Sequence, residues 1–295
     1  QSASFGGNKV SVILEVRNLT HTYGEKTPFI NDAIKNLNFK INKGEIIGII
    51  GHTGSGKSTL VQHLNGLLKP TSGTVLLMDK DIWEEPKKIR DVRFKVGLVF
   101  QYPEYQLFEE TVFADIAFGP KNMGIKDSEL EKRVYEIANL VGIKPEYMEK
   151  SPFDLSGGEK RRVAIAGVMA MRPEVLILDE PVAGLDPKGR ADVVEIIKKY
   201  ASEYNATVMI VSHNMEDMAV LADKLIVMNK GEIDRFDTTY NVFSDAEHLK
   251  SIGLNVPIVT NILRTIKAKG YDVREDIFTV GEALEYLLKA GSGND

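Results

Sequence analysis

Short apolar runs separated by glycine-rich or polar segments recur along this chain. Ile46–Ile50, Val175–Leu178 and Thr207–Val211 are almost wholly apolar, as expected of strands buried inside a sheet. Val12–Arg17 and Leu37–Ile41 carry alternating and β-branched residues, which also predicts strands. Further strands are expected at Gly73–Met78, Val96–Phe100, Lys224–Met228 and Glu232–Phe236, the last two joined as a hairpin at Lys230-Gly231.

Helical spacing dominates the segment from about Thr111 to Met171. Within it, Ser128–Leu140 places apolar residues at the intervals of one helix face. Single helices are expected at Lys57–Leu68 and Gly189–Tyr204, between predicted strands. The pattern therefore predicts an α/β core with a helical insert.

Two amphipathic helices are expected near the C-terminus, at Val256–Lys267 and Thr279–Lys289. Thr279 and Glu282 have the spacing of a capping box at the start of the second helix. The apolar faces of these helices can pack either on the core of this chain or on a partner subunit. Those faces consist of Ile262, Leu263, Ile266, Leu284, Leu287 and Leu288.

Composition narrows the class of protein. With 295 residues, 43% of them hydrophobic, the chain can bury a substantial core in one large domain or two smaller ones. A formal net charge of −5 disfavours a broad nucleic-acid-binding surface, and the absence of cysteine excludes disulfides and thiolate metal sites. No apolar run reaches the roughly 18–20 residues of a spanning helix, and no signal peptide is visible. The polar ends Gln1–Asn8 and Gly291–Asp295 are interpreted as tails.

The most informative stretch is Gly51–Thr59, which reads G-H-T-G-S-G-K-S-T between a predicted strand and a predicted helix. In that context its glycines let the backbone curl around an anion, and the loop amides point at phosphate oxygens. Lys57 can reach the outer phosphates and the Ser58 hydroxyl can hold Mg²⁺; the alternative is a plain turn. The residues expected to bind nucleotide here are Gly51, Gly54, Ser55, Gly56, Lys57, Ser58 and Thr59.

Titratable side chains, two acids and a histidine, follow two of the apolar runs. Asp179 and Glu180 come directly after one run, where a parallel topology brings them beside the phosphate loop. Asp179 can bind Mg²⁺, and Glu180, expected to point the other way in an extended segment, can orient or deprotonate the attacking water. His213 follows the next run and is expected to contact the γ-phosphate. The alternatives are solvated acids in a surface turn and a structural histidine.

Two further segments carry weaker signals. Ser156 with Glu159 fits a capping box, which alone marks only a helix start. Gly157 and Gly158 each weaken that helix by about 1 kcal/mol relative to alanine, so their presence indicates that a second phosphate approaches bare amides. Tyr23 can stack on a purine ring if it lies near the phosphate loop; otherwise it packs in a turn.

In their order along the chain, these segments resemble the motifs of an ABC-type ATPase over about residues 12–240. The resemblance implies an α/β P-loop nucleotide-binding domain, in which a RecA-like core carries an antiparallel β subdomain and a helical subdomain. The matching motifs are an adenine-stacking aromatic (Tyr23), Walker A (Gly51–Thr59), the Q-loop (Gln101), the signature motif (Leu155–Glu159), Walker B (Val175–Glu180), the D-loop (Gly184–Asp186) and the H-loop (His213).

A narrower resemblance is to the ATPases of energy-coupling factor (ECF) transporters, which import vitamins or transition-metal ions. It is carried by Gln101–Val112, Asp115–Pro120 and His63–Pro70, and the start of the phosphate loop is similar to the second of the two ATPase types in such complexes. This family implies a second ABC ATPase subunit, a transmembrane scaffold subunit and a substrate-binding membrane subunit, at the cytoplasmic face of the cell membrane. We expect an ATPase domain at 10–240, with a helical subdomain inserted at about 105–172, and a C-terminal helical extension at 241–295 that can serve in dimerisation.

The resemblance further implies a head-to-tail homodimer or heterodimer with two ATP sites at the interface. Walker A and B of one subunit then face Ser156, Gly157, Gly158 and Asp186 of the other. Mg²⁺ would be held by Ser58, Gln101 and Asp179, and the catalytic roles would fall to Lys57, Gln101, Glu180 and His213.

Glu104, Glu109 and Glu110 are candidates for pairing with basic residues of a membrane partner, and an ordinary solvated acidic face is the alternative. Two other classes of function compete with transport. A soluble ABC ATPase acting on nucleic acid or ribosomes would need a coiled-coil insert, zinc cysteines or tandem cassettes, none of which this sequence has. An ABC-type scaffold in cofactor assembly is disfavoured by the resemblance over 101–120.

Overall fold

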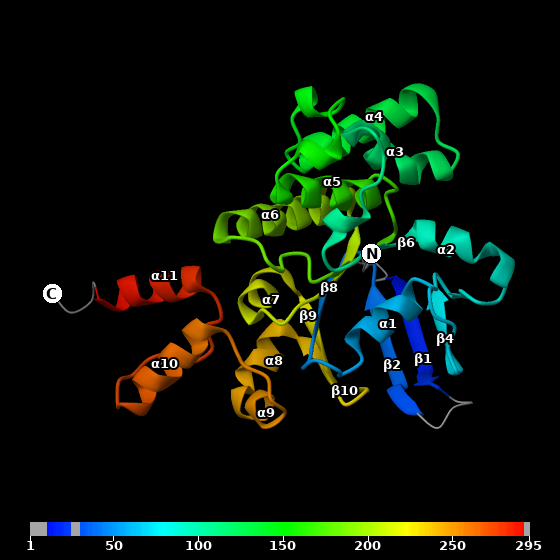
Figure 1. Cartoon of the computed structure of the whole chain (residues 1–295). Coiled ribbons are helices and arrows are strands. Elements are labelled where there is room, and N and C mark those ends of the chain that lie inside the picture. Colours follow the sequence, from blue (N-terminus) through cyan, green and yellow to red (C-terminus); the bar gives the residue numbers. More distant parts are fainter. Residues whose placement is uncertain (1–10, 25–29, 292–295) are drawn as a thin grey trace, which may run out of the picture.

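The computed structural model describes residues 11–24 and 30–291, which form two β-sheets covered by helices (Figure 1). The segments 1–10 and 292–295, with most of the predicted tails, and the loop 25–29 lie outside the described residues. Within the described ranges, no helix combines the length and the apolar character that crossing a bilayer requires.

The central sheet has six strands in the order β10-β9-β3-β8-β7-β6. All its neighbouring strands are parallel except β9 and β10, which form the predicted hairpin. Lys230 and Gly231 at its turn both have positive φ, as the tight turns of hairpins require. The predicted strands are thus confirmed: β3 (Ile46–Ile50), β6 (Val96–Val99), β7 (Val175–Asp179), β8 (Thr207–Val211), β9 (Lys224–Asn229) and β10 (Glu232–Thr238).

A smaller antiparallel sheet lies beside the central one, with the order β2-β1-β4-β5 (Figure 1). Its first two strands are longer than predicted, because their pairing continues as far as Tyr23 and Asn31. Leu14 and Val75 of this sheet pack in one hydrophobic cluster with Leu60, on the helix that follows β3. The strands are β1 (Val12–Tyr23), β2 (Asn31–Asn42), β4 (Ser72–Leu77) and β5 (Lys80–Asp81).

The predicted helical insert is present and is seen at the top of Figure 1. Leu130, Val134 and Ile137 are buried on one face of its second helix, which confirms the helical spacing. Its helices are α3 (Val112–Asn122), α4 (Asp127–Leu140) and α5 (Gly157–Met169), with short 3₁₀ turns η2 (Pro103–Gln106), η3 (Pro145–Tyr147) and η4 (Pro152–Asp154).

Helices of the core differ from the predictions mainly at their ends. α1 (Lys57–Leu64) stops before the predicted Leu68, because Gly66 adopts a φ of +70° that a helix cannot contain. α6 (Pro187–Tyr204) confirms the predicted helix there, whereas η1 (Pro86–Lys88), α2 (Ile89–Lys95) and α7 (Met215–Leu221) were not predicted.

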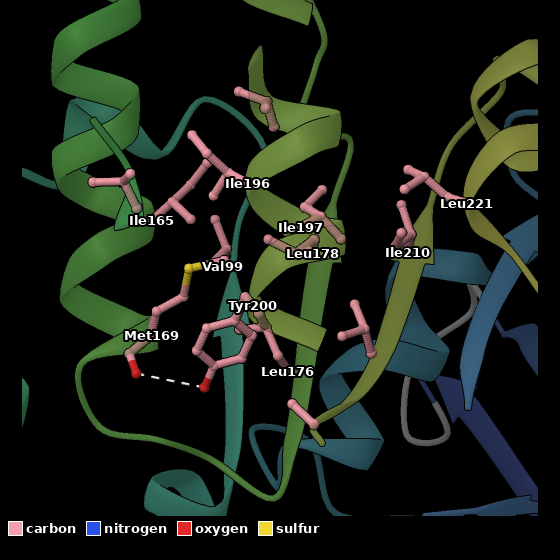
Figure 2. Packing of buried hydrophobic residues seen from close by; sticks show 14 of the residues in the cluster. Val99, Ile165, Met169, Leu176, Leu178, Ile196, Ile197, Tyr200, Ile210 and Leu221 are labelled. Carbon is pink, nitrogen blue, oxygen red and sulfur yellow. Dashed lines mark hydrogen bonds between the residues drawn. The ribbon is translucent and has the colours of Figure 1, made fainter. Parts of the chain in front are cut away.

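Helices α5 and α6 pack on the central sheet through a dense apolar layer (Figure 2). Ile165 and Met169 of α5 face Ile196 and Tyr200 of α6 across this layer, and the Tyr200 hydroxyl donates to the Met169 carbonyl oxygen at 3.5 Å. All four residues are among the buried core. This packing fixes the insert against the strands whose ends form the site described below.

The C-terminal part contains α8 (Thr239–Ser244), α9 (Ala246–Ser251), α10 (Ile258–Ala268) and α11 (Val280–Gly291). The predicted capping box of Thr279 and Glu282 is confirmed, while Gly291, expected in a tail, ends α11. Side chains of α8 and α9 belong to the main core, whereas α10 and α11 share a small separate cluster.

Most of the apolar residues predicted for the faces of α10 and α11 do not pack on the core. Leu263 is buried, but Ile262, Leu284, Leu287 and Leu288 are between 45% and 64% exposed. The sequence left two expectations for these side chains, packing on the core or on a partner subunit. For these four residues, packing on the core is wrong.

Candidate nucleotide-binding site

The carboxyl ends of β3, β6, β7 and β8 lie at one edge of the central sheet, because these strands are parallel neighbours. The loop 51–59 follows β3, and Gln101, Asp179 and His213 lie at or just beyond the ends of the other three strands. All of these segments line one cleft of about 700 Å³. The predicted site residues in its lining are Tyr23, Gly54, Gly56, Lys57, Ser58, Thr59, Gln101, Asp179, Glu180 and His213.

The three glycines of the loop meet different requirements. A Cβ on Gly56 would lie 2.6 Å from the Ala33 carbonyl oxygen, and one on Gly51 would lie 2.4 Å from the Met228 carbonyl oxygen. These two glycines therefore let the loop pack against β2 and β9. Gly54 has a φ of +81° and, among the described residues, no neighbour within 4 Å of its Cβ position, so of these three glycines it is the one that leaves open space on the loop.

Lys57 begins α1 and carries its ammonium into the cleft. Its Nζ donates to the carbonyl oxygens of Gly51 and His52, at 2.6 and 3.0 Å. Burial lowers the pKa of Lys57, and the carboxylates of Glu180 and Asp179 oppose that change. No side chain caps α1, since its N-cap is Gly56, so the free amides of its first turn add to the positive field. The site is suited to a multiply charged anion.

Glu180 does not have the extended conformation that the sequence predicted. Its φ is +51°, in the left-handed region that few residues other than glycine adopt. The prediction is wrong because β7 ends at Asp179 and the chain turns at the next residue, whose amide donates to the Val211 carbonyl oxygen at 2.9 Å. Both carboxyl groups nevertheless line the cleft.

The buried acids have raised pKa values. Burial raises the pKa of Glu180 to about 7, the Asp179 carboxylate adds to the rise, and Lys57 opposes it. Burial also raises the pKa of Asp179, against the effects of Lys57 and His213. Glu180 is therefore able to exchange a proton near neutral pH, which is the property of a general base.

His213 lies beside Glu180, with its Nδ1 atom 2.7 Å from Glu180 Oε1. Burial and Lys57 together lower the pKa of His213, so the imidazole is mainly neutral at neutral pH. Its side chain is 65% exposed. The histidine can therefore contact a ligand in the cleft, and it is not a satisfied residue of the core.

Tyr23 lies near the phosphate loop, which was the condition for it to stack on a purine ring. Its hydroxyl lies 3.4 Å from Thr59 Oγ1, at the start of α1, and both residues line the cleft. The ring is 41% exposed and packs at its edge against His21, with centroids 4.4 Å apart. One face of the cleft thus carries an accessible aromatic ring.

Several residues of the cleft were not predicted from the sequence. The turn at Lys230-Gly231 was predicted, but nothing in the sequence indicated that it lies against the phosphate loop, where the Gly231 amide donates to the Ser55 carbonyl oxygen at 3.1 Å. Gly51 and Ser55 do not line the cleft, and Ser55 is fully buried. The additional lining residues are Asn31, Asp32, Ala33, Thr53, Val211, Lys230 and Gly231.

The signature-motif and D-loop residues that were predicted to contact nucleotide do not line this cleft. They are Ser156, Gly157, Gly158 and Asp186. Ser156 and Glu159 form the complete predicted capping box at the start of α5. Within the part of the chain that the structure describes, a Cβ on Gly157 would meet nothing within 4 Å, and one on Gly158 only the end of a flexible side chain at 4.0 Å. Asp186 caps α6 by accepting a hydrogen bond from a backbone amide at 2.8 Å.

Glu104 is not available to a basic partner, contrary to the prediction. Its carboxylate accepts two hydrogen bonds from Arg161, at 2.8 and 2.9 Å. Nearby, Glu110 is exposed and Glu109 half-buried. Two exposed aromatic residues of this segment were also not predicted, Tyr105 at 84% and Phe108 at 59%, because spacing alone does not distinguish core aromatics from surface ones.

Comparison with known proteins identifies the family. Residues 34–183 match the family described as ABC transporter. The chain is 53% identical over 276 residues to the energy-coupling factor transporter ATP-binding protein EcfA2 of Caldanaerobacter subterraneus subsp. tengcongensis, covering 94% of this chain and 96% of that protein. Among solved structures it resembles cbiO1 of Clostridium perfringens, part of the ABC transporter complex cbiONQ, with a TM-score of 0.74 and 37% identity over 86% of this chain and 99% of that one.

A second solved structure gives a further comparison. It is a dimeric ATP-binding cassette in a post-hydrolysis state with ADP and Pi, and it matches with a TM-score of 0.69 and 29% identity over 77% of this chain and 99% of that one. These similarities extend well beyond the phosphate loop and agree with the cleft that the fold builds. The chain therefore belongs to the ABC transporter family, and within it to the ATP-binding proteins of energy-coupling factor transporters, and it is an ATPase.

Proposed function

We propose that this chain binds Mg-ATP in the cleft, and that closure of a head-to-tail dimer around two nucleotides drives import through partner membrane subunits. The observation that carries the proposal is the convergence of the phosphate loop, Lys57, Asp179 and Glu180 on one cleft. Lys57 and the amides of the loop and α1 supply positive charge for the phosphates. The exposed ring of Tyr23 offers a stacking surface for adenine.

Ser58, Gln101 and Asp179 are suited to hold Mg²⁺. They offer a hydroxyl, an amide oxygen and a carboxylate, which are the hard oxygen donors that this ion prefers, and all three line the cleft. Once bound, the ion would neutralise negative charge on the β- and γ-phosphates.

Glu180 is the proposed base or orienting group for the attacking water. With a pKa of about 7 it can accept a proton at neutral pH. His213, beside it and exposed, would contact the γ-phosphate with a neutral imidazole. Lys57 would remain charged and stabilise the negative charge that develops on the transferred phosphoryl group.

A second subunit would complete each site. Ser156, Gly157, Gly158 and Asp186 lie outside the cleft of their own chain, and no neighbour among the residues that the structure describes requires glycine at 157. The backbone amides of Gly157 and Gly158, in the first turn of α5, are suited to a phosphate presented by another subunit. The similar dimeric cassette with ADP and Pi supports this arrangement, and the exposed apolar face of α10 and α11 would add to the contact between subunits.

Partner membrane subunits would supply the transport pathway. The relatives are named as parts of transporters, so we infer a transmembrane scaffold subunit, a substrate-binding membrane subunit and a peripheral location at the cytoplasmic face. The imported substrates would be vitamins or transition-metal ions. A soluble ABC ATPase acting on nucleic acid, ribosomes or cofactor assembly is not favoured, because the similarity to transporter subunits extends over 94% of the chain.

The test uses Glu180→Gln, with Lys57→Ala as the matched loss-of-binding control. Glu180→Gln should abolish turnover but retain Mg-ATP and accumulate dimers, because binding persists while the base is lost. Lys57→Ala should bind nucleotide poorly and stay unpaired. Size-exclusion chromatography with and without Mg-ATP reports dimers, and pull-down from membranes reports partners. Steady-state hydrolysis by Glu180→Gln, or a protein free of membrane partners, would contradict the proposal.

A further inference from the structure

Arg161 is a nearly fully buried cation for which the proposed chemistry gives no role. It lies on α5, the helix that Ser156 caps, and its side chain is only 2% exposed. An arginine in the interior is stable only when its N–H groups are paired. The partners of its guanidinium are therefore informative.

Those partners come from two other segments of the site. Nε and Nη2 donate to the two carboxylate oxygens of Glu104, at 2.9 and 2.8 Å, in a bidentate pair. Nη1 donates to the Ala183 carbonyl oxygen at 2.5 Å and more weakly to that of Pro181 at 3.4 Å. The guanidinium also lies 5.7 Å from the centroid of the Tyr102 ring.

Both segments adjoin residues that line the cleft. Glu104 belongs to η2, which follows Gln101. Pro181 and Ala183 belong to the turn that leaves Glu180, where the Ala183 amide donates to the Glu180 carbonyl oxygen at 3.2 Å. The arginine therefore fixes the backbone on which the strained Glu180 depends, and it does so from the same end of α5 that carries the signature motif.

The hydrogen bonds between Arg161 and Glu104 join two opposite charges. Burial is the largest effect on the pKa of Glu104 and raises it, but the hydrogen bonds from Arg161, a backbone hydrogen bond and the charge of Arg161 together bring the pKa below its ordinary value. The carboxylate is thus ionised at neutral pH and paired with the guanidinium. Lysine could not make the same set of contacts, because one ammonium cannot hold a carboxylate bidentately and also reach the two carbonyl oxygens on the other side.

We propose that Arg161 is a positioning residue that couples the two ATP sites of the dimer. This inference rests on the proposed head-to-tail arrangement, in which Ser156 serves the nucleotide of the partner while Gln101 and Glu180 serve the nucleotide of their own chain. Contact of the partner's nucleotide with the start of α5 then shifts the guanidinium, and with it both segments that it holds. Arg161 acts on Gln101 and Glu180 without touching the nucleotide.

The test compares Arg161→Lys and Glu104→Gln with a matched pair elsewhere. Arg172 and Glu136 form a more exposed pair with a hydrogen bond of 2.5 Å, and Arg172 also lies near an aromatic ring, but neither residue lines the cleft. Arg172→Lys and Glu136→Gln are therefore the controls. For each full-length variant in its assembled complex, one measures the melting temperature, the Kd for Mg-ATP, kcat, and the Hill coefficient of ATP hydrolysis.

The proposal expects wild-type hydrolysis with a Hill coefficient approaching about 2. Arg161→Lys and Glu104→Gln should keep the Kd for Mg-ATP within about twofold, since neither side chain lines the cleft, while kcat falls about ten- to a hundredfold and the Hill coefficient falls to about 1. The control variants should behave as wild type. Glu104→Gln preserves the shape of the side chain, so it keeps the test decisive if Arg161→Lys fails to fold.

Two results would overturn the inference in distinguishable ways. If the wild type is cooperative and Arg161→Lys and Glu104→Gln are equally cooperative, with only a lower melting temperature, Arg161 is merely structural and the dimer proposal survives. If the wild type itself shows neither cooperativity nor nucleotide-dependent dimers, the head-to-tail proposal and this inference fail together.

Discussion

Glu180 should destabilise the protein whenever its carboxyl group is ionised in the absence of nucleotide. The side chain is 8% exposed, and burial raises its pKa from 4.5 to about 7. Below pH 4.5 the group is protonated in both folded and unfolded chains, so it does not change the free energy of unfolding. Between pH 4.5 and 7 the unfolded chain releases the proton that the folded chain keeps, and unfolding becomes progressively easier.

The size of the effect follows from the pKa shift. The difference from 4.5 to about 7 is about 2.5 units, and one unit corresponds to about 1.36 kcal/mol. Above pH 7 the ionised carboxyl should thus lower the free energy of unfolding by about 3 kcal/mol. Glu180→Gln cannot ionise and should recover this amount at pH 8 but not at pH 4. For a chain of this size, that corresponds to roughly 6–12 °C in melting temperature.

The assay is thermal unfolding of the wild type and Glu180→Gln at pH 4, 6 and 8, in EDTA and without nucleotide. Glu131→Gln, on the exposed part of α4, is the control, and its melting temperatures should follow those of the wild type. A constant difference between wild type and Glu180→Gln across this pH range would refute the reasoning, because it would show that the carboxyl group is not desolvated. In the same framework, kcat/KM of the wild type should rise with pH through about 7.

Three further substitutions test other parts of the site. Gly56→Ala should lower the free energy of unfolding by about 2 kcal/mol or more, since its Cβ would lie 2.6 Å from the Ala33 carbonyl oxygen at a φ of +100°; scanning calorimetry measures this, and an unchanged melting temperature would contradict it. Gly157→Ala meets no atom within 4 Å and should leave the melting temperature unchanged or slightly raised, while slowing hydrolysis by the dimer; equal turnover would remove the proposed role of this amide. Tyr23→Ala should weaken ATP binding by about tenfold or more in titration calorimetry, because base stacking contributes roughly 1–3 kcal/mol, whereas Tyr23→Phe should bind as the wild type does. Equal affinity of the alanine and phenylalanine variants would exclude stacking.

Much of the site could be predicted because its residues follow apolar runs. Such runs form parallel strands, and parallel strands bring their carboxyl ends to one edge. Lys57, Asp179 and His213 were therefore predictable together although they are far apart in the sequence. The helix starts at Ser156 and Thr279 were also predictable, because capping depends only on residues within one turn.

Other features depended on contacts between segments that share no sequence pattern. The turn at Lys230-Gly231 lies on the phosphate loop through a hydrogen bond to the Ser55 carbonyl oxygen, and no local signal marks that pairing. Glu104 looked like a surface acid because its neighbours are polar or aromatic, but Arg161, far along the chain, removes it from the surface.

The sequence by itself thus determined the strands of the core, most of the helices, the phosphate-binding loop and several of the groups that line the cleft, since these follow from local periodicity and from the chemistry of single residues. Only the tertiary structure decided the left-handed conformation of Glu180, its pKa near 7 and the linkage through Arg161. The physical reason is that desolvation and long-range hydrogen bonds depend on which segments surround a group, and neighbours in space are specified by the whole fold.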